Sequence, residues 1–184
     1  SPKAIKKIIE HYPSNTSKNT IRRHVNVLIN EAKHLGMKNN PMQAVKSFKS
    51  KAVLHKPFND VKSALEDIKS YNKNLYLCCL LTYGCLLRPH REVRELVWGD
   101  FTSDLKFIKL SGSRNKSGKN RVVPVPFFVR EILNKNKEDI NIFSGTVKQY
   151  NPDYFKTLWG KYKKQSDVLE VGQTLYSFRH SGAI

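Results

Sequence analysis

Three groups of cationic side chains have the chemistry to bind an anion. Arg88 and Arg91 follow a long apolar stretch, Lys116 lies in a polar loop, and Arg179 and His180 lie close to the last residue. A guanidinium group keeps its charge and donates paired hydrogen bonds in a fixed plane, which suits the oxygens of a phosphate. Taken singly, each group has a simpler explanation, as a salt-bridged helix end, a solvated turn lysine or a surface cation. A shared role requires that the surrounding elements bring the three groups together.

The stretch from Leu75 to Leu87 is apolar on nearly all sides, which is typical of a helix buried by several neighbours. It is too short, and too closely flanked by charge, to cross a membrane. Pro89 ends or restarts the helix. The arginines on both sides of this proline outnumber the nearby carboxylates of Glu92 and Glu95. Either these arginines lie on a solvated rim, or they point toward an anion that the chain does not carry, and the second explanation accounts for more of the sequence.

The composition favours a nucleic-acid partner. The 184 residues include 33 Lys and Arg against 15 Asp and Glu, a formal net charge of +18. Such an excess attracts polyanions, most simply the phosphates of a nucleic acid. The alternative is a basic surface kept for solubility. The sequence shows no signal peptide, membrane span or low-complexity tail, so we expect a cytoplasmic protein with no membrane partner.

The three cysteines, Cys78, Cys79 and Cys85, all lie in the apolar stretch. Adjacent cysteines on a helix cannot form an ordinary disulfide, and their spacing is not that of metal ligands. They are therefore interpreted as small core residues in a reducing compartment, with no metal site expected. A catalytic thiol is the alternative.

The sequence pattern of residues 1–52 predicts the C-terminal end of a helical domain. A basic helix is expected over residues 2–12, and a second one over residues 20–35 that ends at Gly36. The apolar residues of the second helix follow a three-four spacing: Ile21, Val25, Leu28, Ala32 and Leu35. A short helix begins at Asn40-Pro41, and residues 49–57 have no periodicity and form the expected linker.

The sequence pattern of residues 53–184 predicts a mainly helical domain with a small antiparallel sheet, an α+β fold. A helix capped by Asn59 or Asp60 precedes the apolar stretch. Residues 105–111 and 121–125 are expected to pair as a hairpin around a long basic loop, and Pro124 places the second strand at an edge. The remaining expected elements are a short helix at 127–133, an extended run at 140–143, a helix beginning at Asn151-Pro152, and a last helix capped by Ser177.

Together these motifs resemble the tyrosine recombinases, the phage-type integrase family of site-specific DNA recombinases. In that family an arginine follows an apolar helix, a lysine occupies a β-hairpin, and a His-x-x-Arg box lies downstream. The matching segments here are Tyr83-Gly-Cys-Leu-Leu-Arg88-Pro-His-Arg-Glu92 with Leu96-Val-Trp98-Gly-Asp100, then SRNKSGKNRVVPVP around Lys116, and LYSFRHSGAI around Arg179. The resemblance covers almost the whole chain. The style of the motifs suggests a mobile-element integrase, of a Bacteroides-type transposon.

The resemblance implies phosphoryl transfer on double-stranded DNA without a metal or nucleotide cofactor. A tyrosine hydroxyl attacks the scissile phosphate and gives a 3′-phosphotyrosyl link and a free 5′-hydroxyl. Arg88 and Arg179 clamp the phosphate, Lys116 protonates the leaving 5′-oxygen, and His180 is the family's following histidine. Further DNA contacts are implied for Arg91, Arg114, Lys119 and Arg121. The complete protein is expected to form a homo-tetramer on DNA.

The chain departs from the family pattern in three places. The first box has one residue more than usual before Trp98, which leaves Arg91 as an alternative to Arg88. Tyr176 stands where the family has the histidine of the second box, and a phenol donates a hydrogen bond but does not shuttle a proton near neutral pH. The nucleophilic tyrosine belongs beyond Ile184.

The tyrosines before the second box, Tyr150, Tyr154 and Tyr162, are expected to lie in the core or on a DNA-facing surface. Residues 1–52 are thus interpreted as the C-terminal part of a core-binding domain, and residues 53–184 as a catalytic domain truncated before its nucleophile. Such a fragment is expected to bind DNA weakly and not to cleave it.

Two other functions compete with this interpretation. A non-catalytic DNA-binding regulator derived from an integrase is consistent with Tyr176. An RNA-binding or ribosomal helical protein needs only the charge. A nucleophilic tyrosine after Arg179 supports the recombinase, whereas equal binding to duplex RNA supports the last alternative.

Overall fold

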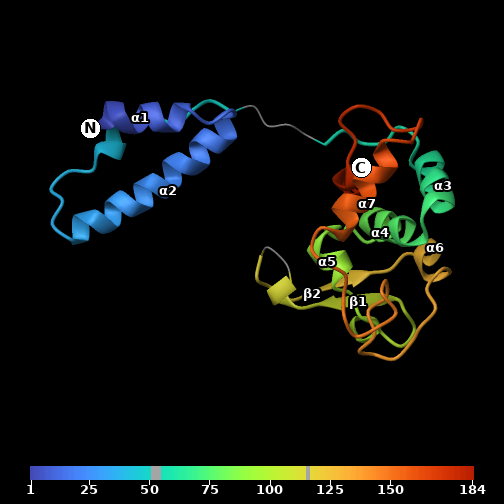
Figure 1. Ribbon diagram of the computed structural model, residues 1–184. Helices are drawn as coiled ribbons and strands as arrows, with labels where there is room; N and C mark the ends of the chain where they lie inside the picture. The colour runs from blue at the N-terminus through green and yellow to red at the C-terminus, as the bar shows by residue number, and fades with distance from the viewer. Residues whose placement is uncertain (51–54, 115–116) are drawn as a thin grey trace. The chain divides into compact units, whose positions relative to one another are not determined.

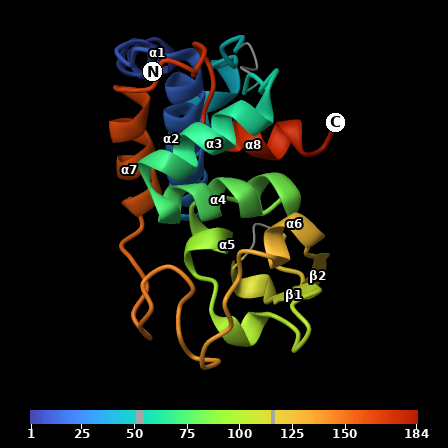
Figure 2. The ribbon, with the colours of Figure 1, turned by 90° about the vertical axis from the view of Figure 1, so that its right-hand side faces the viewer.

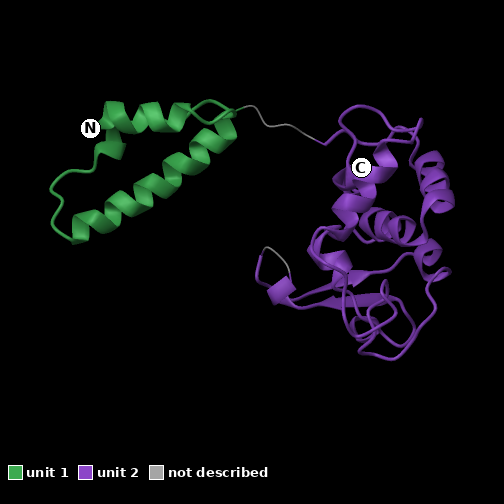
Figure 3. Cartoon of the chain, viewed as in Figure 1, with its two compact units in different colours: residues 1–53 green, residues 54–184 purple. Residues whose placement is uncertain are grey.

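The computed structural model describes residues 1–50, 55–114 and 117–184 (Figure 1). The chain divides into two compact units, residues 1–53 and residues 54–184 (Figure 3). Most of the described elements are helices, and the two strands form one antiparallel sheet. The predicted fold class, mainly helical with a small antiparallel sheet, is therefore confirmed.

Unit 1 consists of helices α1 (Pro2–Glu10) and α2 (Asn15–His34) and the 3₁₀-helix η1 (Pro41–Ala44). Its small core is formed by Ile9, Met42 and Val45 with partly buried Ile5, Ile21, Val25, Ile29 and Phe48. The hydroxyl of Ser14 accepts a hydrogen bond from the Ser17 amide at 3.0 Å, so α2 begins before the predicted position.

The predicted inner face of α2 is partly wrong. Leu28 and Leu35 are 68% and 89% exposed, whereas Ile29 packs into the core of unit 1. The inner face therefore follows residues 21, 25 and 29, a spacing of four, and leaves Leu28 on the outer side. Gly36 ends the helix with a φ of 104°, as predicted.

Helix α4 (Lys73–Gly84) is the centre of unit 2. It contacts five other helices: α3 (Val61–Tyr71), α5 (Arg91–Arg94), α6 (Phe127–Arg130), α7 (Tyr154–Lys163) and α8 (Leu175–Ser181). Figure 2 shows α4 below α3 and α8 and above the sheet. These neighbours on several sides explain why the α4 sequence is apolar all round. Cys78 and Cys79 in α4 and Cys85 directly after it are all buried, as predicted.

The hairpin consists of β1 (Phe107–Leu110) and β2 (Arg121–Pro124), with Phe107 opposite Pro124 and Leu110 opposite Arg121. Alternate residues point into the core, and the inward side chains are Ile108, Leu110 and Val123. Two further 3₁₀-helices, η2 (Trp98–Asp100) and η3 (Gly112–Arg114), flank β1. The predicted extended run near residue 141 forms an isolated bridge between Val97 and Asn141.

The start of α8 differs from the prediction. Its N-cap is Thr174, and Ser177 is three residues further on. The Ser177 hydroxyl accepts a hydrogen bond from the Thr174 amide at 2.9 Å, which is the reciprocal half of a capping box. Ser177 thus stabilises the start of α8 from inside the helix. Among the described residues, the helices are all too short or too polar to span a membrane.

Gly182 lets the end of α8 approach α4 closely. A Cβ atom at this position would lie well inside van der Waals contact with the Tyr83 carbonyl oxygen, which is backbone and cannot rotate away. We therefore expect Gly182→Ala to lower the free energy of unfolding by about 1–3 kcal/mol, the usual cost of overpacking. Urea denaturation followed by circular dichroism measures the change.

Gly160 provides the matched control. It lies inside α7, and a Cβ atom there would meet no atom within 4 Å. Gly160→Ala should therefore raise the free energy of unfolding by about 0.5–1 kcal/mol, because alanine loses less backbone entropy in a helix. Equal effects of the two substitutions would contradict the role given to Gly182.

Candidate active site

Arg88 and Glu92 form the first part of the candidate site, where α4 has ended and α5 begins. The Arg88 amide donates to Glu92 Oε2 at 2.9 Å, and the Arg88 guanidinium pairs with Glu92 Oε1. The side chain of Glu92 is 1% exposed, whereas 34% of the Arg88 side chain is exposed. The buried carboxylate therefore holds a guanidinium group whose other donors can reach solvent.

Arg121 from β2 binds the same carboxylate. Its Nη2 atom donates to Glu92 Oε2 at 2.8 Å, and 33% of its side chain is exposed. Glu92 therefore joins the turn after α4 to the hairpin. The sequence alone gave no indication of this double pairing, because residues 92 and 121 are distant in the chain.

Arg179 on α8 completes an arginine cluster, defined here as Arg88, Arg121 and Arg179 around Glu92. Its guanidinium donates to the carbonyl oxygen of Leu86, a residue with a positive φ of 54°. Burial lowers the pKa of Arg179, and the positive charges of Arg88 and Arg121 lower it further. The negative charge of Glu92 opposes this effect.

The arginine cluster has the electrostatics of an anion site. Three guanidinium groups from three separate segments lie within electrostatic range of one another, and Glu92 supplies one negative charge among these described residues. The pKa of a guanidinium starts so high that the lowered pKa of Arg179 leaves it charged near neutral pH. The arrangement can bind a phosphate through paired hydrogen bonds.

Arg91, the alternative to Arg88, lies outside the arginine cluster. Its side chain is 62% exposed, and its Nε atom is 3.5 Å from Glu95 Oε2. The geometry therefore favours Arg88 as the partner of Arg179 and leaves Arg91 on the surface.

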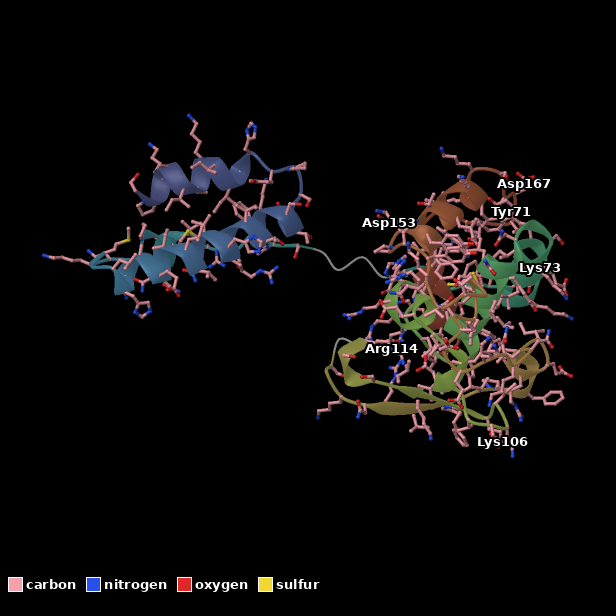
Figure 4. All side chains as sticks on the ribbon, turned by 60° about the horizontal axis from the view of Figure 1, so that its bottom comes forward. Tyr71, Lys73, Lys106, Arg114, Asp153 and Asp167 are labelled. Carbon is pink, nitrogen blue, oxygen red and sulfur yellow. The ribbon has the colours of Figure 1, made fainter. Side chains whose placement is uncertain are left out.

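Arg114 is engaged within the fold. Its guanidinium pairs with both carboxylate oxygens of Asp100, one of them at 2.7 Å, and donates to the Glu95 carbonyl at 3.0 Å. The hydrogen bond to Asp100 raises the pKa of Arg114. Figure 4 shows Arg114 where the hairpin meets the body of unit 2. Its donors anchor the hairpin, an arrangement that does not favour the DNA contact expected for it.

The hairpin loop carries the other two predicted lysines. Lys116 lies outside the described residues, and Lys119 is exposed. The described ends of the loop are held together by the Gly112 amide, which donates to the Asn120 side chain at 2.8 Å. A Cβ atom at Gly112 would collide with the carbonyl oxygen of Gly118, so glycine is required for this close approach.

Tyr176, which stands at the place of the family's histidine, is half-buried against the imidazole rings of His55 and His90. The His55 ring stacks on it with a centroid distance of 5.3 Å, and the His90 ring lies 6.0 Å away. The ring of exposed His180 is 5.6 Å from that of His55, and His55 Nδ1 is 3.0 Å from the Thr174 hydroxyl. We call these four residues the histidine–tyrosine group.

Neither His55 nor His90 is among the site residues that the sequence predicted. His90 stands two residues after Arg88 within the first box, which could have drawn attention to it. His55 lies in the predicted linker, where no periodicity gives a signal. Among the described residues, no group of three His, Cys, Asp or Glu side chains is placed to hold a metal ion.

The other candidate nucleophiles are engaged in packing. The rings of Tyr150 and Tyr154 stack at 3.9 Å, and the Tyr162 hydroxyl donates to Asp67 at 2.5 Å. Burial raises the pKa of the Cys85 thiol to about 12, which disfavours the reactive thiolate. These tyrosines and this cysteine are accordingly structural.

Comparison with family models gives no match, and comparison with curated protein sequences gives none either. Solved structures do match. Lambda integrase (residues 75–356) bound to DNA is 19% identical with a TM-score of 0.80, over 100% of this chain and 70% of that chain. A lambda integrase tetramer bound to a Holliday junction is 19% identical with a TM-score of 0.81, over 100% of this chain and 58% of that chain.

The Tn1549 transposon integrase in complex with a circular intermediate DNA is 15% identical with a TM-score of 0.66, over 99% of this chain and 71% of that chain. The chain thus spans between 58% and 71% of the length of these structures. Identities this low establish a likeness of fold. The chain has the fold of the lambda and Tn1549 integrases.

Proposed function

We propose that this chain belongs to the tyrosine recombinases and acts in site-specific recombination of double-stranded DNA. The observation that carries the proposal is the arginine cluster, in which Arg88, Arg121 and Arg179 come from three separate segments of an integrase fold. Unit 1 is then part of the core-binding domain, and unit 2 is the catalytic domain. The DNA in the matching structures and the transposon origin of one of them support a mobile-element integrase; the Bacteroides type stays a prediction.

The arginine cluster would bind the non-bridging oxygens of the scissile phosphate. Negative charge gathers on these oxygens in the transition state, and fixed guanidinium donors stabilise it most when they need not reorganise. Arg88 and Arg179 are the clamp in this proposal, and Arg121 is a third donor. Glu92 acts as a positioning residue, because its carboxylate fixes the planes of Arg88 and Arg121.

The proposed reaction exchanges one phosphoester for another. A tyrosine hydroxyl releases its proton to solvent as its oxygen forms a bond to phosphorus, the bond between phosphorus and the 5′-oxygen breaks, and Lys116 gives the leaving 5′-oxygen a proton. The resemblance places this nucleophile after Arg179. Tyr176 contributes at most a hydrogen bond to the phosphate, because a phenol hydroxyl offers a single donor.

A non-catalytic DNA-binding regulator is the second candidate, and Tyr176 is the observation that favours it. The two candidates share the arginine cluster and differ in chemistry. A nicked duplex would become covalently attached to a recombinase and would remain free with a regulator. The tetramer of lambda integrase on a Holliday junction supports a homo-tetramer on DNA as the working assembly of the recombinase.

Duplex DNA binding tests both candidates against the RNA-binding alternative. The formal net charge of +18 should neutralise several phosphates, so affinity should fall about 10³-fold between roughly 50 and 200 mM salt if about six are contacted. Fluorescence anisotropy of a labelled duplex measures this slope. Unlabelled duplex RNA is the control competitor and should displace the DNA poorly. A flat salt response, or equal competition by RNA, would remove the support for a DNA-binding function.

A further inference from the structure

The histidines of the two units are distributed differently. Of the six histidines in the sequence, the three in unit 1, at positions 11, 24 and 34, are exposed. In unit 2, the rings of His55 and His90 contact that of Tyr176, and the His180 ring lies next to that of His55, at the centroid distances given above. Imidazole is the side chain whose ordinary pKa lies closest to neutral pH, so this gathering concentrates titratable charge at one place.

The histidine–tyrosine group borders the arginine cluster. Tyr176 and Arg179 lie one turn apart on α8 and therefore share a face of the helix. The two groups also lie within electrostatic range of each other. His90 follows Arg88 by two residues, after Pro89. A charge that appears on these imidazoles would therefore act on an anion held by the arginine cluster.

The surroundings of the imidazoles are mixed in charge. Burial lowers the pKa of His90, and Lys156 lowers it further, whereas Asp153 at the start of α7 (labelled in Figure 4) raises it. The chain around His90 carries Arg88 and Arg91, and α8 contributes Tyr176. His55 faces Tyr176 and His180 of α8, with the Lys56–Glu170 ion pair next to it.

We propose that His55 and His90 are positioning residues of the candidate site, which hold the Tyr176 ring beside Arg179 and strengthen phosphate binding when they take up protons. The inference rests on the proposed role of the arginine cluster as a phosphate site. His55 stacks on one side of Tyr176 with an interplanar angle of 17°, and the His90 ring is tilted against it by 54°. Loss of either ring removes a contact that fixes the phenol.

The sign of the pH effect follows from linkage. A bound phosphodiester is negative and stabilises the imidazolium form, so the pKa of each histidine is higher in the complex than in the free protein. Binding then takes up protons, and by reciprocity protonation strengthens binding. The affinity for DNA should therefore rise as pH falls through the range in which these histidines take up protons. It should level off once the histidines are protonated both in the free protein and in the complex.

The test compares two double variants with the unmodified protein. Binding of a fluorescein-labelled DNA duplex is measured by anisotropy between about pH 7.5 and 5.5 at constant ionic strength, a range in which histidine is the main titrating side chain. The unmodified protein should bind about tenfold more tightly at the acidic end. His55→Gln with His90→Gln should reduce this gain to about twofold, whereas the control His11→Gln with His34→Gln should keep it.

A second measurement needs no substitution. Proton NMR titration of the histidine rings gives their pKa values with and without the duplex, and His55 and His90 should show higher values in the complex. Equal pH dependence in both double variants, or unchanged histidine pKa values on binding, would overturn the inference. If the duplex binds with a steep salt slope while these results fail, the proposed function stands. If no duplex binds at any pH, the proposed function fails first.

Discussion

Arg179→Ala should reduce DNA cleavage by the full-length protein by about 10³-fold or more, because one guanidinium that stabilises the charge of a phosphoryl transition state is worth that much. Arg88→Ala should have an effect of the same order. Both side chains reach the arginine cluster from outside the main apolar core, and Arg179 loses one hydrogen bond to the Leu86 carbonyl. Arg179→Ala should therefore stay folded at a cost of about 1 kcal/mol for that bond. Arg88→Ala should cost more, because it removes one partner of the buried Glu92 carboxylate, but Arg121 still pairs with that carboxylate.

A nicked duplex that loses its short 5′ fragment on cleavage traps the covalent adduct, and the adduct is measured on a denaturing gel. Arg91→Ala is the matched control, because Arg91 is 62% exposed and lies outside the arginine cluster. It should change the yield only a few-fold. If Arg91→Ala abolished the adduct and Arg88→Ala did not, the assignment of the first arginine would be reversed. A full-length protein that forms no adduct would be the regulator.

Glu92→Gln should lower the free energy of unfolding of unit 2 by about 3 kcal/mol, the lower end of the cost of breaking a buried ion pair. The carboxylate is 1% exposed and pairs with Arg88 and Arg121, so the amide leaves two guanidinium groups without their counter-charge. About a third of each arginine side chain is exposed, which lets water compensate in part. Urea denaturation measures the change.

Glu170→Gln is the control for this substitution. Glu170 pairs with Lys56 at the surface of the same unit, and both side chains are more than two-fifths exposed. An exposed pair contributes less than about 1 kcal/mol, so this variant should be nearly as stable as the unmodified protein. A Glu92→Gln variant equally close to the unmodified protein would show that Glu92 does not hold the arginine cluster together.

Local patterns in the sequence predicted the elements of unit 2 well. The apolar stretch that became α4 contacts several helices, and so nothing on its surface needed to be polar. The alternation of β1 and β2 and the place of Pro124 at the end of β2 also followed from the sequence. In unit 1, the spacing of apolar residues fitted two faces of α2, and only the packing against Ile9 and Met42 selects the one with Ile29.

The candidate site was harder to predict because it depends on contacts between distant segments. The sequence indicated that Glu92 and Glu95 are too few for their arginines, but not that Glu92 binds Arg121 across the hairpin. Arg114 had the same appearance as Arg121 in the sequence, yet Asp100 and Glu95 occupy its donors. His55 gave no signal at all, since its place against Tyr176 follows from how the start of unit 2 meets α8.

The carboxylate of Glu92 is a mechanical link as well as a counter-charge. Arg88 and Arg121 share it, so a shift of β2 can reach the Arg88 guanidinium through the Glu92 carboxylate. DNA that displaces the hairpin on binding would thereby change the orientation of the Arg88 side chain, which belongs to a different segment. The two oxygen atoms of one carboxylate would then couple how firmly the hairpin is held to how the Arg88 guanidinium is oriented.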